Sequence, residues 1–202
     1  MLEFEEKYES EGYSLIAGMD EAGRGPLAGP VCVAIAIMPL AKDKIIDGIN
    51  DSKKLSEKKR EALYEKIINT AISYKIELID EKTIDTINIL NATKLGMYKC
   101  INEIEVKPDI VLVDAVKLDT DIKCEAIIKG DALSYSIACA SILAKVTRDR
   151  LMLELDKKYP EYEFKKHKGY GTKLHIENLK KYGPCDIHRR SFIGHFVSVE
   201  DK

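Results

Sequence analysis

The sequence predicts an α/β domain built on a mixed β-sheet, followed by a mostly helical C-terminal part. Short apolar runs that are typical of strands alternate with segments of helical periodicity. The first two strands are separated by only about ten residues, which is too short for a crossover helix. We therefore expect an antiparallel opening hairpin that continues into strand–helix alternation.

The N-terminal half begins with strands and a capped helix. The run SLIAGM at residues 14–19 is apolar and leads into two acids, and VCVAIAIM at 31–38 is rich in β-branched residues. Ser56 stands where an N-cap is expected, before a helical pattern with one apolar face. The run YKIELI at 74–79 predicts a third strand.

The second half alternates longer helices with shorter strands. Residues 83–106 carry a helical pattern that Pro108 should stop. The uninterrupted apolar run DIVLV at 109–113 is typical of a strand that is covered on both faces. The remaining expected elements are a strand at 124–128, a long helix at 134–159 and a short helix at 173–182.

Composition and charge narrow the class of protein. With 202 residues, 45% hydrophobic and 33% charged, the chain has the composition of a folded protein. It shows no secretory signal pattern and no apolar run of roughly 18 residues, so we expect a cytoplasmic location with no membrane contact. Five scattered cysteines without a Cys-x-x-Cys pair favour buried free thiols: Cys32, Cys100, Cys124, Cys139 and Cys185.

Positive charge gathers near the C-terminus. The net charge is −2, but residues 145–195 hold 13 Lys and Arg against 7 Asp and Glu. This segment is the candidate for contact with a polyanion such as a nucleic acid. The alternative is a basic, solvated surface with no ligand.

Four carboxylates follow predicted strands. They are Asp20 and Glu21 after the first strand, Asp114 after the fourth and Asp131 after the fifth. Open α/β sheets place their sites beyond strand ends, and Mg²⁺ and Mn²⁺ prefer carboxylate oxygens, so the set predicts a metal site. The alternative is that single acids cap turns. Because neighbouring strand residues point to opposite faces, both Asp20 and Glu21 reach one site only if the strand bends or ends at Glu21.

The segment Gly23-Arg24-Gly25 allows two interpretations. With Ala28 it satisfies the loose dinucleotide pattern G-x-G-x-x-A, which requires a helix to start at the glycines. A strand-like run follows instead, which argues against that interpretation. The loop could alternatively bring its backbone close to a sugar or a phosphate.

Further candidates for substrate contact lie downstream. Lys53 sits at a loop-to-helix start, and Lys145 and Arg148 are spaced to share one helix face, as phosphate ligands could be. The alternative for that face is a solvated surface with local pairing to Asp149. Tyr170 stands between two glycines without a core pattern, and an exposed ring there could stack on a sugar or a base.

Seven motifs in order along the chain carry a family resemblance. They are Asp20–Gly25 (DEAGRG), Asp51–Leu55 (DSKKL), Val113–Ala115 (VDA), Gly130–Asp131, Ala138–Asp149 (ACASILAKVTRD), His167–Thr172 (HKGYGT) and His188–Phe192 (HRRSF). Together they resemble the motifs of bacterial ribonuclease HII over essentially the whole chain.

The resemblance implies a fold and an activity. The fold is ribonuclease H-like, with residues 1–160 as the catalytic domain and 161–202 as a helical, basic extension packed on it. The activity is endonucleolytic hydrolysis of the RNA strand of RNA/DNA hybrids, and cutting 5′ of single ribonucleotides embedded in duplex DNA. Two Mg²⁺ or Mn²⁺ ions would act, and the products would carry 5′-phosphate and 3′-hydroxyl ends, as in ribonucleotide excision repair.

The resemblance also implies roles for single residues. The catalytic, metal-binding carboxylates would be Asp20, Glu21, Asp114 and Asp131. Gly23, Arg24 and Gly25 would read the 2′-hydroxyl through the backbone, and Tyr170 would pack on the sugar. Lys53, Lys145 and Arg148 would contact phosphates. We expect a monomer, and residues 199–202 show no sliding-clamp peptide.

Three alternatives stay open from the residues alone. Ribonuclease HIII usually has an extra N-terminal domain, for which the residues before Tyr13 leave no room, and it does not typically carry Gly-Arg-Gly. A binding module with the same fold would recognise hybrid duplexes without cutting them. A dinucleotide-binding enzyme would use Gly23-Arg24-Gly25.

Overall fold

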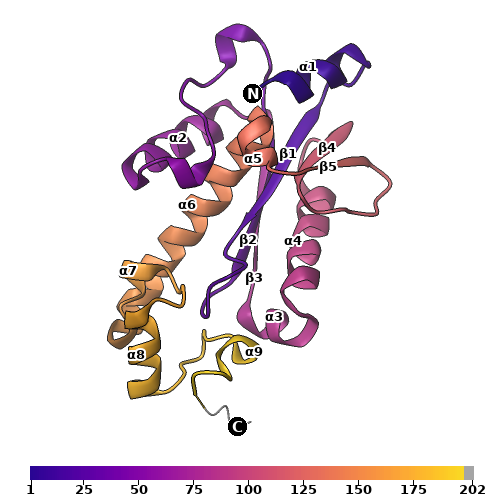
Figure 1. Cartoon of the computed structure of the whole chain (residues 1–202). Coiled ribbons are helices and arrows are strands. Elements are labelled where there is room, and N and C mark those ends of the chain that lie inside the picture. Colours follow the sequence, from indigo (N-terminus) through magenta and orange to yellow (C-terminus); the bar gives the residue numbers. More distant parts are fainter. Residues whose placement is uncertain (198–202) are drawn as a thin grey trace.

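A mixed five-stranded β-sheet forms the centre of the computed structural model, which describes residues 1–197 (Figure 1). The strands are β1 (Ile16–Ala22), β2 (Val31–Ile37), β3 (Ser73–Ile79), β4 (Ile110–Asp114) and β5 (Lys123–Ile127), in the order β3-β2-β1-β4-β5. Strand β2 pairs antiparallel with β1 and β3, whereas β1, β4 and β5 run parallel. The expected mixed sheet and its antiparallel opening hairpin are confirmed.

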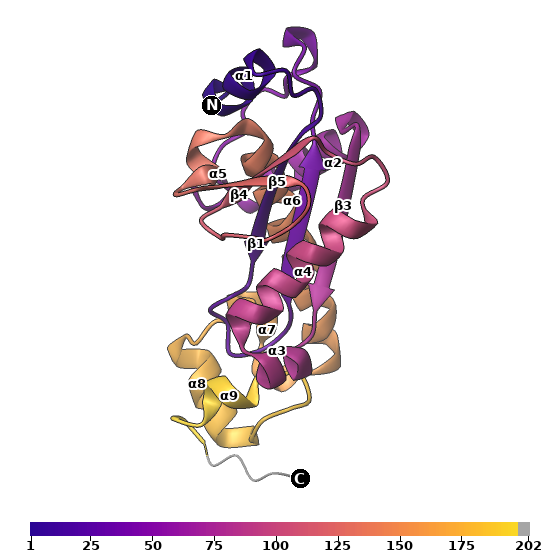
Figure 2. The ribbon, with the colours of Figure 1, turned by 90° about the vertical axis from the view of Figure 1, so that its right-hand side faces the viewer.

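Helices cover both faces of the sheet. They are α1 (Glu3–Ser10), α2 (Glu57–Thr70), α3 (Glu81–Ile87), α4 (Ile89–Glu103), α5 (Gly130–Leu133), α6 (Tyr135–Lys158), α7 (Phe164–His167), α8 (Lys173–Tyr182) and α9 (Arg190–Ile193). Helix α6 packs on β1 and β2 from one side, and α4 packs on β2 and β3 from the other. Helices α7 to α9 gather at one end of the molecule, as both views show (Figure 2).

The helix expected over residues 83–106 is in fact two helices, so that prediction is wrong. The break is at Asn88, whose φ of 66° and ψ of 165° are far from the values of a right-handed helix. The Asn88 side chain then caps α4 by accepting a hydrogen bond from the amide of Asn91. Asn88 therefore ends one helix and caps the next, which the apolar periodicity alone does not reveal.

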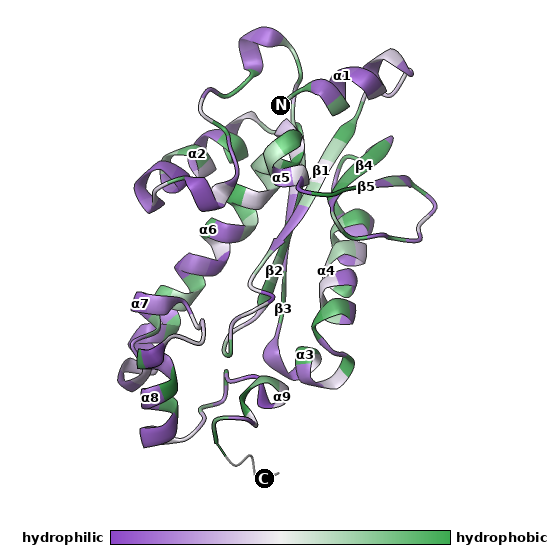
Figure 3. Cartoon of the chain, in the orientation of Figure 1, coloured by the Kyte–Doolittle hydropathy of each residue, from purple (hydrophilic) through white to green (hydrophobic). Residues whose placement is uncertain are grey.

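The core has two layers because the central strands are buried on both faces. Alternate residues of β2 face opposite ways: Ala34 packs in the cluster with α6, and Val33 packs in the cluster with α4. Every residue of β2 is buried. Hydrophobic residues accordingly dominate the central strands, while α2 shows a largely hydrophilic outer surface (Figure 3).

Strand β1 and helix α6 approach each other very closely at Gly18. A Cβ atom added at this position would lie 2.0 Å from the carbonyl carbon of Ser136 in the first turn of α6. Only glycine fits, because a helix backbone cannot move aside as a flexible side chain can. This contact fixes the distance between β1 and the segment that leads into α6.

Further expectations from the sequence concern the cysteines, a membrane-spanning helix and the C-terminus. All five cysteines are free thiols, and Cys32, Cys100 and Cys139 are buried. Within the described part of the chain, no helix combines the length and the apolar character needed to cross a membrane. Residues 199–202, on which the prediction about a sliding-clamp peptide rests, lie outside the described residues.

Gly18→Ala should destabilise the protein by about 3 kcal/mol or more, because the added methyl group meets rigid backbone. For a chain of this size the midpoint of thermal unfolding would fall by about 6–12 °C, since each kcal/mol is worth about 2–4 °C. Differential scanning calorimetry measures it. Gly194→Ala is the matched control, because among residues 1–197 its Cβ would meet nothing within 4 Å and no change is expected. Equal melting temperatures for the two variants would contradict the steric argument.

Candidate active site

The candidate site lies where strands β1 and β4 separate. Their parallel pairing ends at Met19 and Val113, while β1 stays paired with β2 as far as Ala22. The next residues on the two separating strands are Asp20 and Asp114. We predicted that these acids follow their strands, but both lie within the strands, near the C-terminal ends of β1 and β4. The opening between parallel strands is where open α/β sheets place their ligands.

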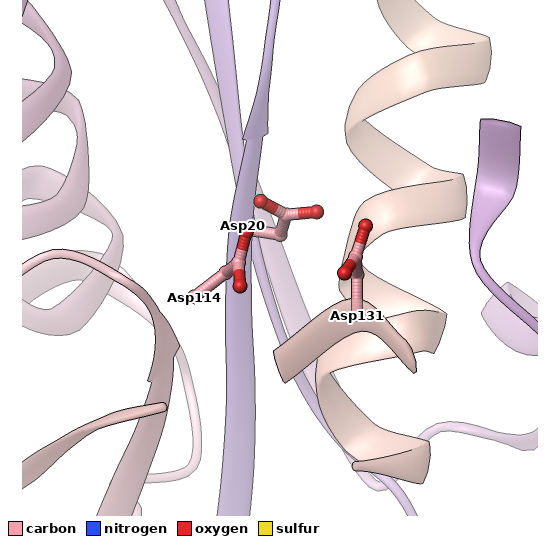
Figure 4. A group of neighbouring side chains, drawn as sticks. All are labelled: Asp20, Asp114 and Asp131. Carbon is pink, nitrogen blue, oxygen red and sulfur yellow. The ribbon is translucent and has the colours of Figure 1, made fainter. Parts of the chain in front are cut away.

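Three aspartates converge at this opening. One carboxylate oxygen each from Asp20, Asp114 and Asp131 lies within 4.8 Å of the other two, and the three side chains point toward one another (Figure 4). Asp131 comes from the short helix α5. The amide of Gly130 donates to Asp114 Oδ1 at 2.7 Å, which ties α5 to the end of β4. Segments distant in the sequence thus deliver three acids to one point.

Glu21 lies beside this triad but is not part of it. Strand alternation turns its side chain away from the face that carries Asp20. Glu21 Oε1 is 3.4 Å from Nη1 of Arg24, and Oε2 is buried with no hydrogen-bond partner within residues 1–197. Strand β1 ends at Ala22, and Gly23 follows with a φ of 95°, one residue later than we expected. Both Asp20 and Glu21 nevertheless line one cleft.

In the absence of a cation, burial and mutual repulsion disfavour the charged form of Asp20 and Asp114. Burial, followed by the nearby charges of Glu21 and Asp114, raises the pKa of Asp20 well above its usual value. Burial is also the main cause of the raised pKa of Asp114, against which the Gly130 amide acts. Charged carboxylates at this site are therefore unfavourable by themselves, and a bound cation would relieve their repulsion.

The residues fit a hard divalent cation. Magnesium and manganese ions take oxygen ligands and keep several waters, which suits a carboxylate cluster that opens to solvent. The unpartnered Glu21 Oε2 offers a further oxygen at the same cleft. Within the described chain, this acidic cluster is the group that could hold a metal ion.

Two lysines flank the acids. Lys53 Nζ lies 3.1 Å from Asp131 Oδ2, although 77% of the lysine side chain is exposed. Lys145 Nζ lies 2.8 Å from Asp149 Oδ1, as the alternative of local pairing predicted. Both lysines line the cleft with the acids. Their positions suit contact with a phosphate that approaches the acids, which stays a prediction.

Arg148 is not where a phosphate contact requires it to be. The side chain is buried, and its guanidinium donates to the backbone carbonyls of Ala28, Pro30 and Lys168 at 2.9–3.1 Å. Three carbonyl acceptors leave it turned to the protein interior. The predicted phosphate role is therefore corrected. Arg148 holds the loop between β1 and β2, whereas Lys145 on the same helix lines the cleft.

The glycine-rich loop and Tyr170 lie together at the rim of the cleft. The cleft has a volume of about 220 Å³ and is lined by Gly23, Arg24, Gly25 and Tyr170 as well as by Asp20, Glu21, Asp114 and the two lysines. Tyr170 is 42% exposed, as expected for a ring that could stack on a ligand. Strand β2 follows the loop, so the helix that dinucleotide binding requires at these glycines is missing.

Two serines in the cleft escaped the sequence analysis as site residues. The hydroxyl groups of Ser52 and Ser141 lie 2.9 Å apart, and Ser141 opposes the rise in the pKa of Asp20 by favouring its charged carboxylate. Ser52 belongs to the DSKK segment, and Ser141 lies one helical turn before Lys145. The sequence shows no signal for their pairing, because 89 residues separate them.

Comparison with known proteins gives a consistent result. A family model described as Ribonuclease HII matches residues 17–195. A ribonuclease HII from Caldicellulosiruptor bescii is 57% identical over 198 residues, covering 98% of this chain and 95% of that protein. The crystal structure of ribonuclease H2 from Pyrococcus horikoshii has a TM-score of 0.76 at 30% identity, covering 88% of this chain and 93% of that one.

A more distant structure shows the fold alone. The structure of Bst-RNase HIII in complex with Mn²⁺ has a TM-score of 0.64 at 20% identity, covering 83% of this chain and 61% of that one. Together with the Pyrococcus structure, it matches the mixed sheet flanked by helices that we predicted.

Asp20→Asn should stabilise the metal-free protein. A carboxyl group whose pKa is raised by folding binds its proton more tightly in the folded chain, so the wild-type protein gains stability as the pH falls through that raised pKa. The asparagine variant should therefore have the higher melting temperature at pH 8 in EDTA, by about 2–4 °C per kcal/mol gained.

The difference between the two proteins should shrink as the pH is lowered, because wild-type Asp20 then becomes protonated. Thermal melts at several pH values measure it. Asp121→Asn, at an exposed acid outside the cleft, is the control and should change nothing. A lower melting temperature for Asp20→Asn at pH 8 would refute the repulsion described above.

Proposed function

Because the chain belongs to the ribonuclease HII family and is a ribonuclease H endonuclease, we propose that it cuts 5′ of single ribonucleotides embedded in duplex DNA. It also hydrolyses the RNA strand of RNA/DNA hybrids. The products carry 5′-phosphate and 3′-hydroxyl ends, and the activity serves the removal of ribonucleotides from DNA. The observation that carries the proposal is one cleft lined both by Asp20 and Asp114 of the acidic triad and by the Gly23–Gly25 loop.

The acids of the triad bind the divalent ions, which are Mg²⁺ or Mn²⁺ and act as a pair with Glu21 as a further ligand. Carboxylate oxygens from β1, β4 and α5 converge within 4.8 Å, which supports this role. When bound, such ions supply activation of a water for in-line attack and stabilisation of the departing 3′-oxygen. A distant structural neighbour was itself solved in complex with Mn²⁺.

The rest of the cleft positions the substrate strand. Gly23, Arg24 and Gly25 approach the ribose through their backbone, and the ring of Tyr170 packs on the sugar of the same nucleotide. A Cβ at Gly25 would lie 3.9 Å from the Tyr170 ring, so the loop and the ring can grip one ribose from two sides. Lys53 and Lys145 contact the flanking phosphates, and their charges offset the repulsion between those phosphates and the acids.

The C-terminal segment supports the duplex-binding role. Residues 145–195 hold 13 Lys and Arg against 7 Asp and Glu, although the whole chain has a net charge of −2. Their helices α7 to α9 gather at the end of the molecule toward which β1 runs (Figure 1). We retain residues 1–160 as the catalytic domain and 161–202 as an extension that packs on it. The protein acts on nucleic acid as a monomer.

Asp114→Asn should lower kcat on a duplex with one embedded ribonucleotide by about 100-fold or more, equivalent to about 2.7 kcal/mol. The reason is that the amide cannot serve as an anionic ligand beside Asp20 and Asp131. Cleavage of a fluorescent duplex with Mn²⁺ or Mg²⁺ measures it, and EDTA should abolish wild-type activity. Asp121→Asn is the control with full activity. Hybrid binding without any cleavage by the wild-type protein would point to a binding module instead.

Tyr170→Ala should raise KM for the single-ribonucleotide duplex by about tenfold, because a stacked ring contributes about 1–3 kcal/mol. Tyr170→Phe keeps the ring and should stay within about twofold of the wild type, since a shift of this size is worth under 0.5 kcal/mol. Steady-state cleavage kinetics on the same duplex separate the two variants. If Tyr170→Phe and Tyr170→Ala were equally impaired, the phenolic hydroxyl rather than ring packing would carry the role.

A further inference from the structure

A buried arginine lies directly beneath the glycine-rich loop. Arg189 is 0% exposed, and its guanidinium donates to three backbone carbonyls of the segment between β1 and β2. Nη2 donates to Gly23 O at 2.6 Å, Nη1 to Arg24 O at 2.9 Å and Nε to Gly29 O at 2.9 Å. Each of the three guanidinium nitrogens of Arg189 thus donates to a loop from the other end of the chain.

These bonds determine where the loop amides point. The peptide bonds of this loop are trans, and in a planar trans peptide the C=O and N–H groups point in opposite directions. The carbonyl of Gly23 shares its peptide unit with the amide of Arg24, and the carbonyl of Arg24 shares its unit with the amide of Gly25. Since both carbonyls face Arg189, both amides face away from it.

The amides of Arg24 and Gly25 are free to bind a ligand. Neither donates a hydrogen bond within residues 1–197, and both residues line the cleft that holds the acids and Tyr170. Their carbonyls accept hydrogen bonds from a cation, which polarises the peptide units and makes the two amides stronger donors. Arg148 adds support from below, because a Cβ at Gly23 would lie 2.0 Å from its Nε.

We propose that Arg189 is a positioning residue for ribonucleotide recognition, which holds the Gly23 and Arg24 carbonyls inward so that the amides of Arg24 and Gly25 are aimed at the ribose 2′-hydroxyl. The inference rests on the proposed function, because it concerns the same cleft. The two amides make the contact that distinguishes ribose from deoxyribose, and Arg189 sets their orientation without contacting the substrate. Lysine cannot replace Arg189 here, since one ammonium nitrogen cannot span three carbonyls as the planar guanidinium does.

The test compares Arg189→Lys with Arg190→Lys, its neighbour on an exposed side chain. Both substitutions are made in the Asp114→Asn background with Mg²⁺ present, in which cleavage of the bound duplex should be about 100-fold slower or more. Fluorescence anisotropy gives Kd for a duplex with one ribonucleotide and for the same duplex made only of DNA. The readout is the ratio of the two Kd values, which general loss of structure would not change selectively.

Arg189→Lys should lower the ribonucleotide preference by about tenfold, equivalent to about 1.4 kcal/mol, and leave the affinity for the all-DNA duplex unchanged. Arg190→Lys should keep the preference. An unchanged preference in Arg189→Lys overturns the inference, as does an equal loss of affinity for both duplexes. A wild-type protein that does not cut the ribonucleotide duplex overturns the proposed function itself, and this inference with it.

A second measurement needs no folded Arg189 variant. Amide hydrogen exchange on the Asp114→Asn protein should show Arg24 and Gly25 exchanging rapidly when free, because neither amide is hydrogen-bonded. The ribonucleotide duplex should protect both amides, and the all-DNA duplex should not. Equal protection by the two duplexes, or protection by neither, overturns the inference.

Discussion

Three carboxylates held within 4.8 Å of one another repel each other, and much of the surrounding structure keeps them in place. Asp20 and Asp114 project from strands whose other residues are packed into the core, so neither backbone can withdraw. The amide of Gly130 donates to Asp114, and the amide of Glu21 donates to Asp20. The stability of the hydrophobic core thus maintains a charge cluster that is unfavourable by itself, which is a common arrangement at metal-dependent sites.

The position of this cluster depends on a close backbone contact. Gly18 lets β1 lie against the first turn of α6, and Asp20 lies two residues further along the same face of β1. Helix α5, which carries Asp131, immediately precedes α6. A side chain at residue 18 would push β1 away from this region, so one glycine sets the spacing between acids on different elements.

Loops rather than strands form the rest of the cleft, and buried arginines hold those loops. Regular strands satisfy their carbonyls by pairing, whereas the segment from Gly23 to Pro30 has carbonyls that turn inward without strand partners. Arg148 and Arg189 together donate to five of them. Burial lowers the pKa of Arg189 to about 9, a value at which the guanidinium keeps its charge near neutral pH. The C-terminal segment therefore completes the cleft from within.

The sequence by itself determined the sheet, the hairpin, the long helix and the identity of the acids, because local periodicity and strand ends are written in neighbouring residues. It could not show that Asn88 divides a helix, nor decide whether Glu21 joins the three aspartates, since these depend on exact backbone angles and strand ends. Only the tertiary structure decided which basic residues line the cleft and which are buried. Lys145 and Arg148 share a helix, yet one lines the cleft and the other is buried under a loop. The reason is physical: a side chain's environment is set by whatever packs against it, and the acceptors that Arg148 and Arg189 bind in the loop between β1 and β2 lie more than 100 residues away.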